Sequence, residues 1–272
     1  MQRAIIHTRA GRIAVAVVLG AGTLALFLLM RGVALRDDVT PEATIASFAW
    51  LTLLPWTLAW LLDRAWAGEA DVADGLVVLR RRDRRVEVPI TSIAGLDPWR
   101  LPLPGPGLGL RLASGRRLAY ELRPSDLAAF VDALERSGAP AGAAKSAAVV
   151  YARGRRARAG YHPILKFVVF GFAPAAIFFN AHQFIAYGGT FGQYYLEGPG
   201  AWLQTLAVFW ATMVVYLTAW ATLWRLAAEA IVLAAAHAMP PATPGVRRAV
   251  EVACWLAYWV GVPALVALRF LA

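Results

Sequence analysis

Five long runs without a charged residue constrain the fold of this chain more than any other feature. They cover residues 13–30, 43–62, 167–196, 198–224 and 252–268. A helix that crosses a bilayer core needs roughly 20 apolar residues, within a range of about 17–25. Each run is long enough, and the surplus length of the third and fourth indicates a loop between them. The runs therefore predict an α-helical membrane protein with about five transmembrane helices.

The composition agrees with this interpretation. Hydrophobic residues make up 59% of the 272 residues and charged residues 16%, whereas soluble domains contain about 45–50% and about 25%. A soluble enzyme is therefore excluded as the default, and so is disorder, because disordered chains are poor in apolar residues. The single cysteine, Cys254, cannot form an internal disulfide or a cysteine-based zinc site.

Two further features of the runs need an interpretation. The first run, preceded by a basic flank at residues 1–12, could be a cleaved signal peptide, but no A-x-A-like site precedes Arg31 or Arg36. We predict a retained membrane anchor. Residues 230–246 are also uncharged, but they contain Pro240 and further prolines that break a helix, so we expect a loop there.

The distribution of arginine and lysine predicts the orientation of the spans. The segment from Arg64 to Lys166 holds 18 basic residues, and the loop between the third and fourth spans holds none. Basic residues accumulate in cytoplasmic loops. We therefore expect a cytoplasmic N-terminus, a cytoplasmic segment between the second and third spans, and an external C-terminus. Arg31 and Arg36 oppose this orientation.

The pattern changes between residues 68 and 140, where short alternating segments replace the long runs. Residues 76–79, 86–88, 108–112 and 118–122 have the β-branched or alternating composition of strands. The helical spacing of the apolar residues at 127–134 then predicts an amphipathic helix with Ser125 as its N-cap. Antiparallel strands closed by one helix predict a small α+β or barrel-like domain.

Three segments of this region resemble bacterial pleckstrin-homology-like (PH-like) domains: "DGLVVLRRRDRRVEVPITSIAGL", "GLGLRLASGRRLAYEL" and "PSDLAAFVDALE". The residues that match the turn after a strand are Val88, Pro89, Ile90 and Ile93. Those that would plug the barrel are Leu127, Phe130 and Leu134. The resemblance implies a binding or assembly module without catalysis. Together with the arginine- and alanine-rich composition, it implies the bacterial inner membrane.

These patterns divide the chain into four parts. Residues 1–67 carry the first two transmembrane helices, 68–140 the cytoplasmic PH-like domain, 141–163 a basic linker, and 164–272 the third to fifth helices. From Lys145 to Lys166 no acidic residue occurs. The basic residues are Lys145, Arg153, Arg155, Arg156, Arg158 and Lys166. They predict contact with anionic lipid, at about 1 kcal/mol per residue, or they only hold the loop inside.

A polar stretch at residues 178–200 adjoins the predicted outer end of the third span. Its candidate site residues are Asn180, His182, Gln183, Tyr187, Tyr194, Tyr195 and Glu197. Polar groups at membrane depth are costly and indicate function by default, so these residues predict an outward-facing pocket or docking loop. The alternative is an aromatic interface belt followed by a glycine-rich turn.

The sequence contains no pattern typical of a metal, cofactor or catalytic site. Of the four histidines, none forms an i, i+4 pair, and His162 and His182 lie about 30 Å apart if they share one helix. No nucleophile elbow, Walker loop or dinucleotide fingerprint occurs. The arginines at 80–85 with their neighbouring acids indicate a solvated hairpin rather than a nucleic-acid site.

Small residues recur in the last span at Ala253, Ala257 and Gly261, a spacing that permits close helix packing. The expected partners are the lipid bilayer and either another membrane protein or a second copy of the chain. The leading hypothesis is a non-enzymatic inner-membrane protein whose PH-like module binds a partner and assists assembly or regulation of a membrane complex. The alternatives are a small transporter or channel subunit, or a membrane enzyme that acts on lipid or quinone through the His182–Glu197 region.

Overall fold

The computed structural model describes residues 2–34, 40–82, 84–155 and 164–271. Within these residues, five helical stretches are long and apolar enough to cross a membrane. They are Arg9–Gly32, Pro41–Ala65, Ile164–Tyr187, Pro199–Ala238 and Pro240–Ala267. Only 11–22% of the residues in each apolar window are buried inside the protein, so most of their apolar side chains are available to lipid. The prediction of five apolar helices is confirmed.

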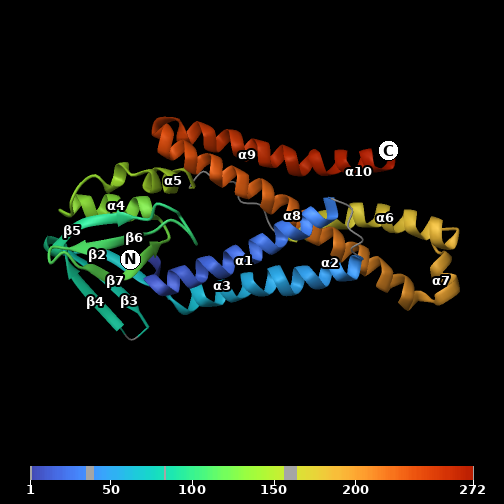
Figure 1. Cartoon of the computed structure of the whole chain (residues 1–272), viewed down its shortest axis with the longest axis horizontal. Helices are drawn as coiled ribbons and strands as arrows, with labels where there is room; N and C mark the ends of the chain where they lie inside the picture. Colours follow the sequence, from blue (N-terminus) through green and yellow to red (C-terminus); the bar gives the residue numbers. More distant parts are fainter. Residues whose placement is uncertain (1, 35–39, 83, 156–163, 272) are drawn as a thin grey trace. The chain divides into compact units, whose positions relative to one another are not determined.

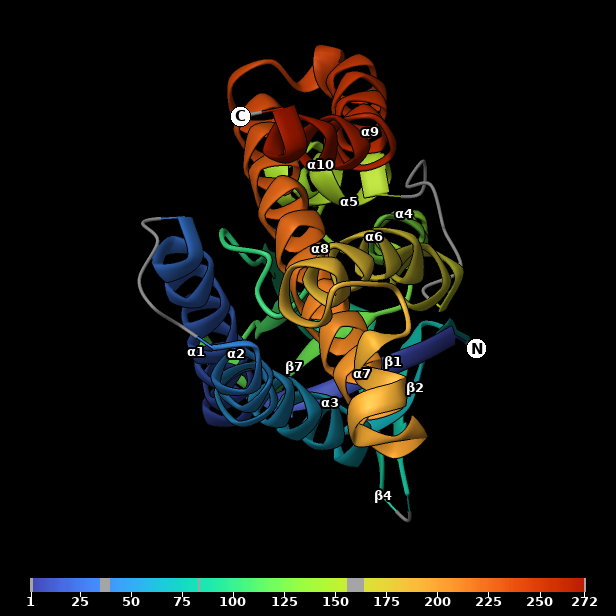
Figure 2. The same ribbon diagram turned by 90° about the vertical axis from the view of Figure 1, so that its right-hand side faces the viewer.

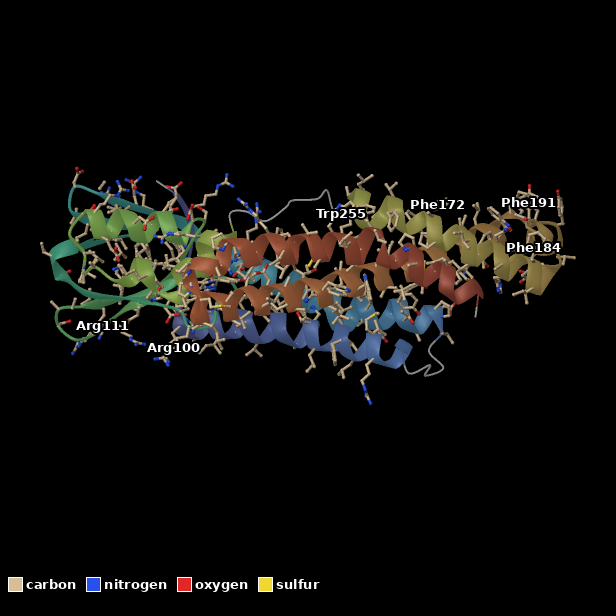
Figure 3. All side chains as sticks on the ribbon, turned by 90° about the horizontal axis from the view of Figure 1, so that it is seen from above. Arg100, Arg111, Phe172, Phe184, Phe191 and Trp255 are labelled. Atoms are coloured by element: carbon tan, nitrogen blue, oxygen red, sulfur yellow. The ribbon has the colours of Figure 1, made fainter. Side chains whose placement is uncertain are left out.

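The chain divides into two compact units, which we describe separately. The sheet unit comprises Met1–Ala21, Pro55–Arg158 and Glu229–Val250. The helical unit comprises Gly22–Leu54, Ala159–Ala228 and Glu251–Ala272. Charged side chains such as Arg100 and Arg111 project from the sheet unit, whereas Phe172, Phe184 and Trp255 project from helices of the helical unit (Figure 3).

An antiparallel sheet organises the sheet unit (Figure 1). Its strands are β1 (Gln2–Thr8), β2 (Ala67–Ala73), β3 (Leu76–Arg81), β4 (Arg84–Pro89), β5 (Ile93–Pro98), β6 (Leu108–Leu112) and β7 (Arg117–Pro124). Among the described residues the strand order is β4-β3-β2-β1-β7-β6-β5. The sheet is not closed, so the barrel expected from the sequence is not confirmed.

Strand β1 lies in the middle of the sheet, between β2 and β7 (Figure 2). It comes from the segment interpreted above as a basic membrane flank. Ile5 is paired with Ala67 on one side and with Arg123 on the other. Because β1 and β2 are neighbours, the first residue of α1 and the last residue of α3 are both attached to the centre of the sheet.

Helix α4 (Leu127–Arg136) packs on the sheet and supplies much of its core. Leu127, Phe130 and Leu134, the expected plug residues, are all at most 2% exposed. The N-cap is Asp126, whose Oδ1 accepts a hydrogen bond from the Ala129 amide at 3.0 Å. The assignment of Ser125 as N-cap was wrong, because the Ser125 amide donates to the Arg3 carbonyl and extends the β1–β7 pairing.

The turn matched to the PH-like pattern is a short 3-10 helix, Ile90–Ser92, between β4 and β5. Ile90 and Ile93 are both buried in the sheet core. The other 3-10 segments are Ala143–Lys145 and Pro240–Ala242, and π-helical turns occur at Ala49–Leu53 and Ile164–Val169. The remaining helices are α1 (Arg9–Ala34), α2 (Pro41–Phe48), α3 (Leu54–Ala65), α5 (Ala147–Arg155), α6 (Phe170–Tyr187), α7 (Gly192–Glu197), α8 (Pro199–Ala238), α9 (Thr243–Trp259) and α10 (Gly261–Leu271).

Helix α8 corrects the loop that was predicted for residues 230–246. It continues through Ala238 and has 40 residues, a length of about 60 Å. Residues 230–238 include five alanines, and alanine has the highest helix propensity. The prolines begin only at Pro240, where a short 3-10 turn precedes α9, so they separate two helices and do not remove one.

In the helical unit, aromatic side chains donate hydrogen bonds to backbone carbonyls of an irregular helical segment. The indole N–H of Trp210 donates to the Val168 carbonyl at 2.9 Å, and the Tyr258 hydroxyl donates to the Lys166 carbonyl. Both acceptors lie in the π-helical turn that precedes α6. These bonds satisfy carbonyls in a segment where the regular α-helical pattern is interrupted.

Candidate functional site

The predicted outer polar stretch forms a hydrogen-bond network in the helical unit. Gln183, on α6, and Gln193, on α7, are both buried, and their side-chain amides are joined by a hydrogen bond of 2.8 Å. The Gln193 backbone N–H also donates to Gln183 Oε1 at 3.3 Å. Gln193 was not among the sequence candidates. Its position four residues before Glu197 is the signal that could have identified it.

The same network continues to a carboxylate and two hydroxyls. Gln193 Nε2 donates to Glu197 Oε2 at 2.9 Å and to Thr205 Oγ1 at 3.1 Å. The Tyr187 hydroxyl donates to the other oxygen of Glu197 at 3.1 Å. Three predicted residues, Gln183, Tyr187 and Glu197, are therefore brought together. Their polar atoms bind one another and connect α6, α7 and α8, so the network stabilises the turn between the helices.

The other candidates from this stretch lie outside the network. Asn180, Tyr194 and Tyr195 are exposed, and the rings of Tyr194 and Tyr195 contact each other edge to face. His182 is partly buried, with its ring 5.4 Å from that of Phe209. These placements fit an aromatic interface belt as well as a docking loop, and the prediction of an outer binding site stays a prediction.

The basic linker residues differ in their surroundings. Arg153 is exposed and forms an ion pair with Asp132 at 2.6 Å, and Lys145 is exposed. The Nζ of Lys166 lies 4.3 Å from the centre of the Tyr258 ring. Arg156 and Arg158 lie outside the described residues. Lipid contact by this segment stays a prediction, and Arg155 is distinguished by lining the cavity described below.

The small residues of the last span differ in their surroundings. Ala253 is exposed, and the nearest atom to an added Cβ at Gly261 would be a carbonyl of the same segment, Leu256 O, at 3.8 Å. The Ala257 carbonyl accepts a hydrogen bond from the Trp220 indole on α8 at 2.9 Å. The use of this face between subunits is untested.

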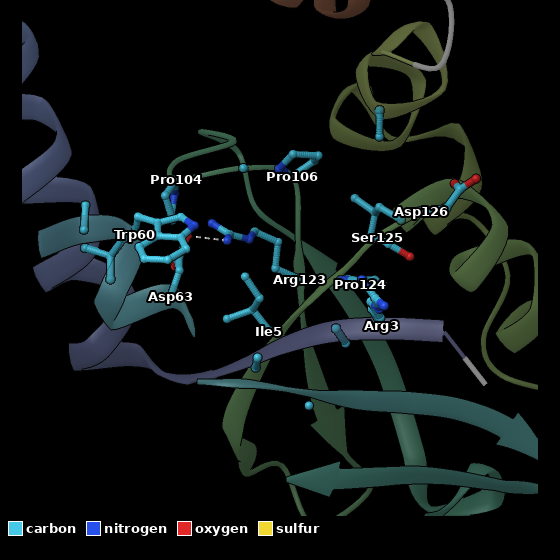
Figure 4. A pocket seen from close by; sticks show the side chains of 18 of the residues that line it. Arg3, Ile5, Trp60, Asp63, Pro104, Pro106, Arg123, Pro124, Ser125 and Asp126 are labelled. Carbon is cyan, nitrogen blue, oxygen red and sulfur yellow. Dashed lines mark hydrogen bonds and ion pairs between the residues drawn. The ribbon is translucent and has the colours of Figure 1, made fainter. Parts of the chain in front are cut away.

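A cavity of about 1020 Å³ lies in the sheet unit, beside β1 and the sheet-proximal ends of α1 and α3. None of the residues of the predicted outer loop lines it. The close-up view shows Trp60 and Pro104 at one end, and Arg3, Ser125 and Asp126 at the other (Figure 4). Sequence analysis missed it, because its walls come from segments up to 152 positions apart, from Arg3 to Arg155.

An ionic cluster borders the cavity and connects a span to the sheet. Asp63, near the end of α3, accepts a hydrogen bond from Arg123 of β7 at 2.5 Å. Asp63 Oδ1 also lies 3.3 Å from Nε2 of His7, which is fully buried in β1. The Arg123 guanidinium supplies the opposite charge that a largely buried carboxylate needs. The cluster therefore fixes the end of the second span to two central strands.

A second ionic cluster joins α5, α8 and α9 within the sheet unit. Arg247 is fully buried and contacts both oxygens of Glu229, at 2.8 and 3.2 Å. The Tyr151 hydroxyl donates to Glu229 at 2.7 Å. Burial, together with the hydrogen bond to Glu229, raises the pKa of Tyr151 to about 12. The arrangement holds the end of α8 and the start of α9 beside α5.

No family model, curated protein or solved structure matches the chain. Within the described residues, no group of three or more histidine, cysteine, aspartate or glutamate side chains could hold a metal ion. The cavity and the Asp63–Arg123 pair that lines it are the candidate site that remains. Their chemistry suits binding, since the cavity combines guanidinium groups, carboxylates and an apolar wall.

Proposed function

We propose that this protein is a non-enzymatic, multi-pass protein of the bacterial inner membrane whose cytoplasmic PH-like module binds a partner protein and assists assembly or regulation of a membrane complex. The observation that carries the proposal is that two apolar helical stretches lie in the chain between β1 and β2, which are neighbours in the sheet. The sheet is thus joined covalently to its proposed anchor at two points. A partner that binds the sheet is therefore coupled mechanically to the helices.

The PH-like assignment is supported by elements that the sequence pattern alone could not place. An antiparallel sheet precedes α4, and the apolar face of α4 enters the sheet core through Leu127, Phe130 and Leu134. Ile90 and Ile93, in the matched turn, contact the same core. This is the arrangement of strands followed by a closing helix that the resemblance implies.

The proposed topology has support from strand pairing. Residues 2–8 and 67–124 contribute to one sheet, so they must lie on the same side of a bilayer. The chain must then cross an even number of times between them, which agrees with the two apolar helices there. The contact of Tyr151 with Glu229 adds the inner end of α8 to that side. The excess of basic residues favours the cytoplasm.

Cysteine labelling in intact cells tests this topology. In a Cys254→Ala background, Gly189→Cys reports the loop after α6 and Arg116→Cys reports the β6–β7 hairpin. We expect a membrane-impermeant maleimide to label Gly189→Cys in intact cells and Arg116→Cys only after lysis. The reverse pattern would overturn the orientation, and equal labelling of both in intact cells would overturn the arrangement of the spans.

The partner is tested by affinity purification of the tagged full chain in mild detergent, with mass spectrometry and an absorption spectrum of the same eluate. An unrelated tagged multi-pass protein is the control bait. A defined membrane complex in fixed ratio, absent from the control, supports the proposal. A protein that elutes alone, or that carries a haem or flavin absorption band, overturns it.

A further inference from the structure

We propose that the cavity beside β1 binds one phospholipid, with its phosphate on Arg3 and Arg155 and an acyl chain against the first two spans. The site lies within the sheet unit. This lipid site is a separate proposal from the partner protein proposed above, and neither proposal requires the other. The lining residues from α1 and α3 are mainly apolar, whereas β1 and the end of α5 contribute arginines.

The apolar end of the cavity is formed by the first two spans. Val15 and Leu19 line it from α1, and Trp56, Ala59 and Trp60 line it from α3. Val15 lies six residues from the first residue of α1, and Ala59 six residues from the last residue of α3. Both are therefore about 9 Å along their helices from the sheet. In a bilayer with a core of about 30 Å, that depth is occupied by acyl chains.

Two arginines, the exposed Arg3 and the half-buried Arg155, supply cationic groups to the lining. Arg3, on β1, and Arg155, at the end of α5, line the cavity, and neither forms an ion pair with a carboxylate of any residue that the structure describes. Arg123, by contrast, binds Asp63. A guanidinium group offers a planar fork of donors that matches phosphate, and the ionic hydrogen bonds that result are strong.

The acidic residues of the lining do not oppose this assignment. Asp63 is held by Arg123, and Asp126 caps α4 through the Ala129 amide. Glu69 remains, directly opposite Arg3 in the β1–β2 register. With the Asp63–Arg123 pair set aside, Arg3 and Arg155 balance Glu69 and Asp126 in formal charge. The phosphate would therefore be held by the guanidinium hydrogen bonds themselves and not by an excess of positive charge, and Glu69 can accept a hydrogen bond from a hydroxyl or ammonium headgroup.

The size of the cavity agrees with a ligand of this class. Its volume of about 1020 Å³ is at the upper end of the roughly 300–1,000 Å³ found for ligand sites. An inorganic phosphate ion would fill only the arginine end and would leave the wall of Val15 and Trp56 without a ligand. The combined chemistry therefore favours a phosphate that carries an acyl chain.

Native mass spectrometry of the delipidated full chain in detergent tests the proposal. The probes are palmitoyl-oleoyl phosphatidylglycerol, palmitoyl-oleoyl phosphatidylethanolamine, dioleoylglycerol and inorganic phosphate. We expect a 1:1 adduct with each phospholipid. The double variant Arg3→Gln/Arg155→Gln should weaken that adduct at least tenfold, and Arg116→Gln, an exposed arginine outside the cavity, should leave it unchanged.

A second pair of variants tests the acyl end. Ala59→Phe fills the cavity wall and should reduce phospholipid binding, whereas Leu58→Phe, which is 46% exposed and outside the lining, should not. The melting temperature of each variant is measured to confirm folding, and the arginine pair decides the test if Ala59→Phe does not fold. Three results would overturn the proposal: dioleoylglycerol binding as well as the phospholipids, equal binding by the double arginine variant and Arg116→Gln, or complete displacement of the lipid by millimolar inorganic phosphate.

Discussion

The two units bury polar side chains in different ways. Among the described residues, the buried polar side chains of the helical unit are uncharged, as in the network around Gln183 and Gln193, and its Arg225–Glu251 ion pair at 2.7 Å stays partly exposed. In the sheet unit, fully buried side chains take part in ionic clusters, His7 beside Asp63 and Arg247 beside Glu229. Uncharged amides can satisfy one another at a modest desolvation cost, whereas buried charges need precise partners.

The comparison also separates a structural network from a binding site. Gln183, Gln193, Tyr187 and Glu197 bind one another, so little of their hydrogen-bonding capacity is left for a ligand. The cavity of the sheet unit keeps Arg3 and Arg155 without a carboxylate partner among the described residues. A polar residue near a membrane is thus a stronger indication of function when its own protein leaves it unneutralised.

The largest effect is expected from breaking the ionic cluster at Arg247. Arg247→Met removes a fully buried cation together with its contacts to both oxygens of Glu229. Removing one partner of a buried pair costs about 3–5 kcal/mol. We expect a large drop in melting temperature of the purified protein in detergent. Arg248→Met, at the exposed neighbouring position, is the control, and equal melting of the two variants would contradict the prediction.

Alkaline pH should weaken the ionic cluster around Glu229 through Tyr151. The pKa of Tyr151 is raised to about 12, above the value of about 10 in an unfolded chain. The protonated phenol therefore contributes stability that is complete below pH 10 and is lost as the pH rises towards 12. The loss is roughly 2–3 kcal/mol.

This pH effect is measured by the difference between the wild type and Tyr151→Phe. Tyr151→Phe should be less stable than the wild type at neutral pH, because the hydrogen bond to Glu229 is lost. Between pH 10 and 12, the wild type should lose stability more steeply than Tyr151→Phe, because Phe cannot ionise. The other tyrosines titrate in both proteins and cancel in the difference. Parallel stability curves for the two proteins would disprove the assignment of the shift to Tyr151.

A smaller effect is expected from the neutral network. Gln193→Leu removes the bonds to Gln183, Glu197 and Thr205 and leaves the buried Gln183 amide without that partner. An unsatisfied buried polar group costs about 1–3 kcal/mol. Thermal unfolding should show this loss. Tyr195→Leu, at a position that is 80% exposed, should be close to neutral, and a similar loss in that variant would contradict the network's importance.

The sequence predicted the parts of the fold that depend on local pattern. The apolar runs identified the spans, and the alternation at 108–112 and the helical spacing at 127–134 identified β6 and α4. It could not identify β1, because Arg3 and Arg9 beside an apolar run have the composition of a membrane flank. Only the pairing of Ile5 with residues 67 and 123, distant in the chain, makes this segment a central strand.

The candidate site was harder to predict for the same reason. Gln183, Tyr187 and Glu197 lie within 15 residues and could be grouped by eye. The walls of the cavity come from several elements, among them β1, α1, α3, β7, α4 and α5. No local sequence pattern indicates that Arg3 and Arg155 line the same cavity. Arg155 was selected as a lipid contact on charge alone, and its position in the cavity gives that prediction a more specific form without testing it.

The smallest effect is expected for an ion pair that the solvent already screens. Arg153 and Asp132 contact at 2.6 Å, and their side chains are 42% and 43% exposed. Exposed pairs contribute about 0–1 kcal/mol.

Arg153 also donates to the Ala144 carbonyl at 3.2 Å, so a single substitution would mix two interactions. A double-mutant cycle with Arg153→Gln and Asp132→Asn isolates the pair. Its coupling energy should be below about 1 kcal/mol and should fall further as salt is raised, because the Debye length shortens from about 10 Å at 0.1 M to 3 Å at 1 M. A coupling energy as large as that of the buried Arg247 cluster, or one that salt does not change, would mean that exposure does not govern the strength of ionic contacts in the sheet unit.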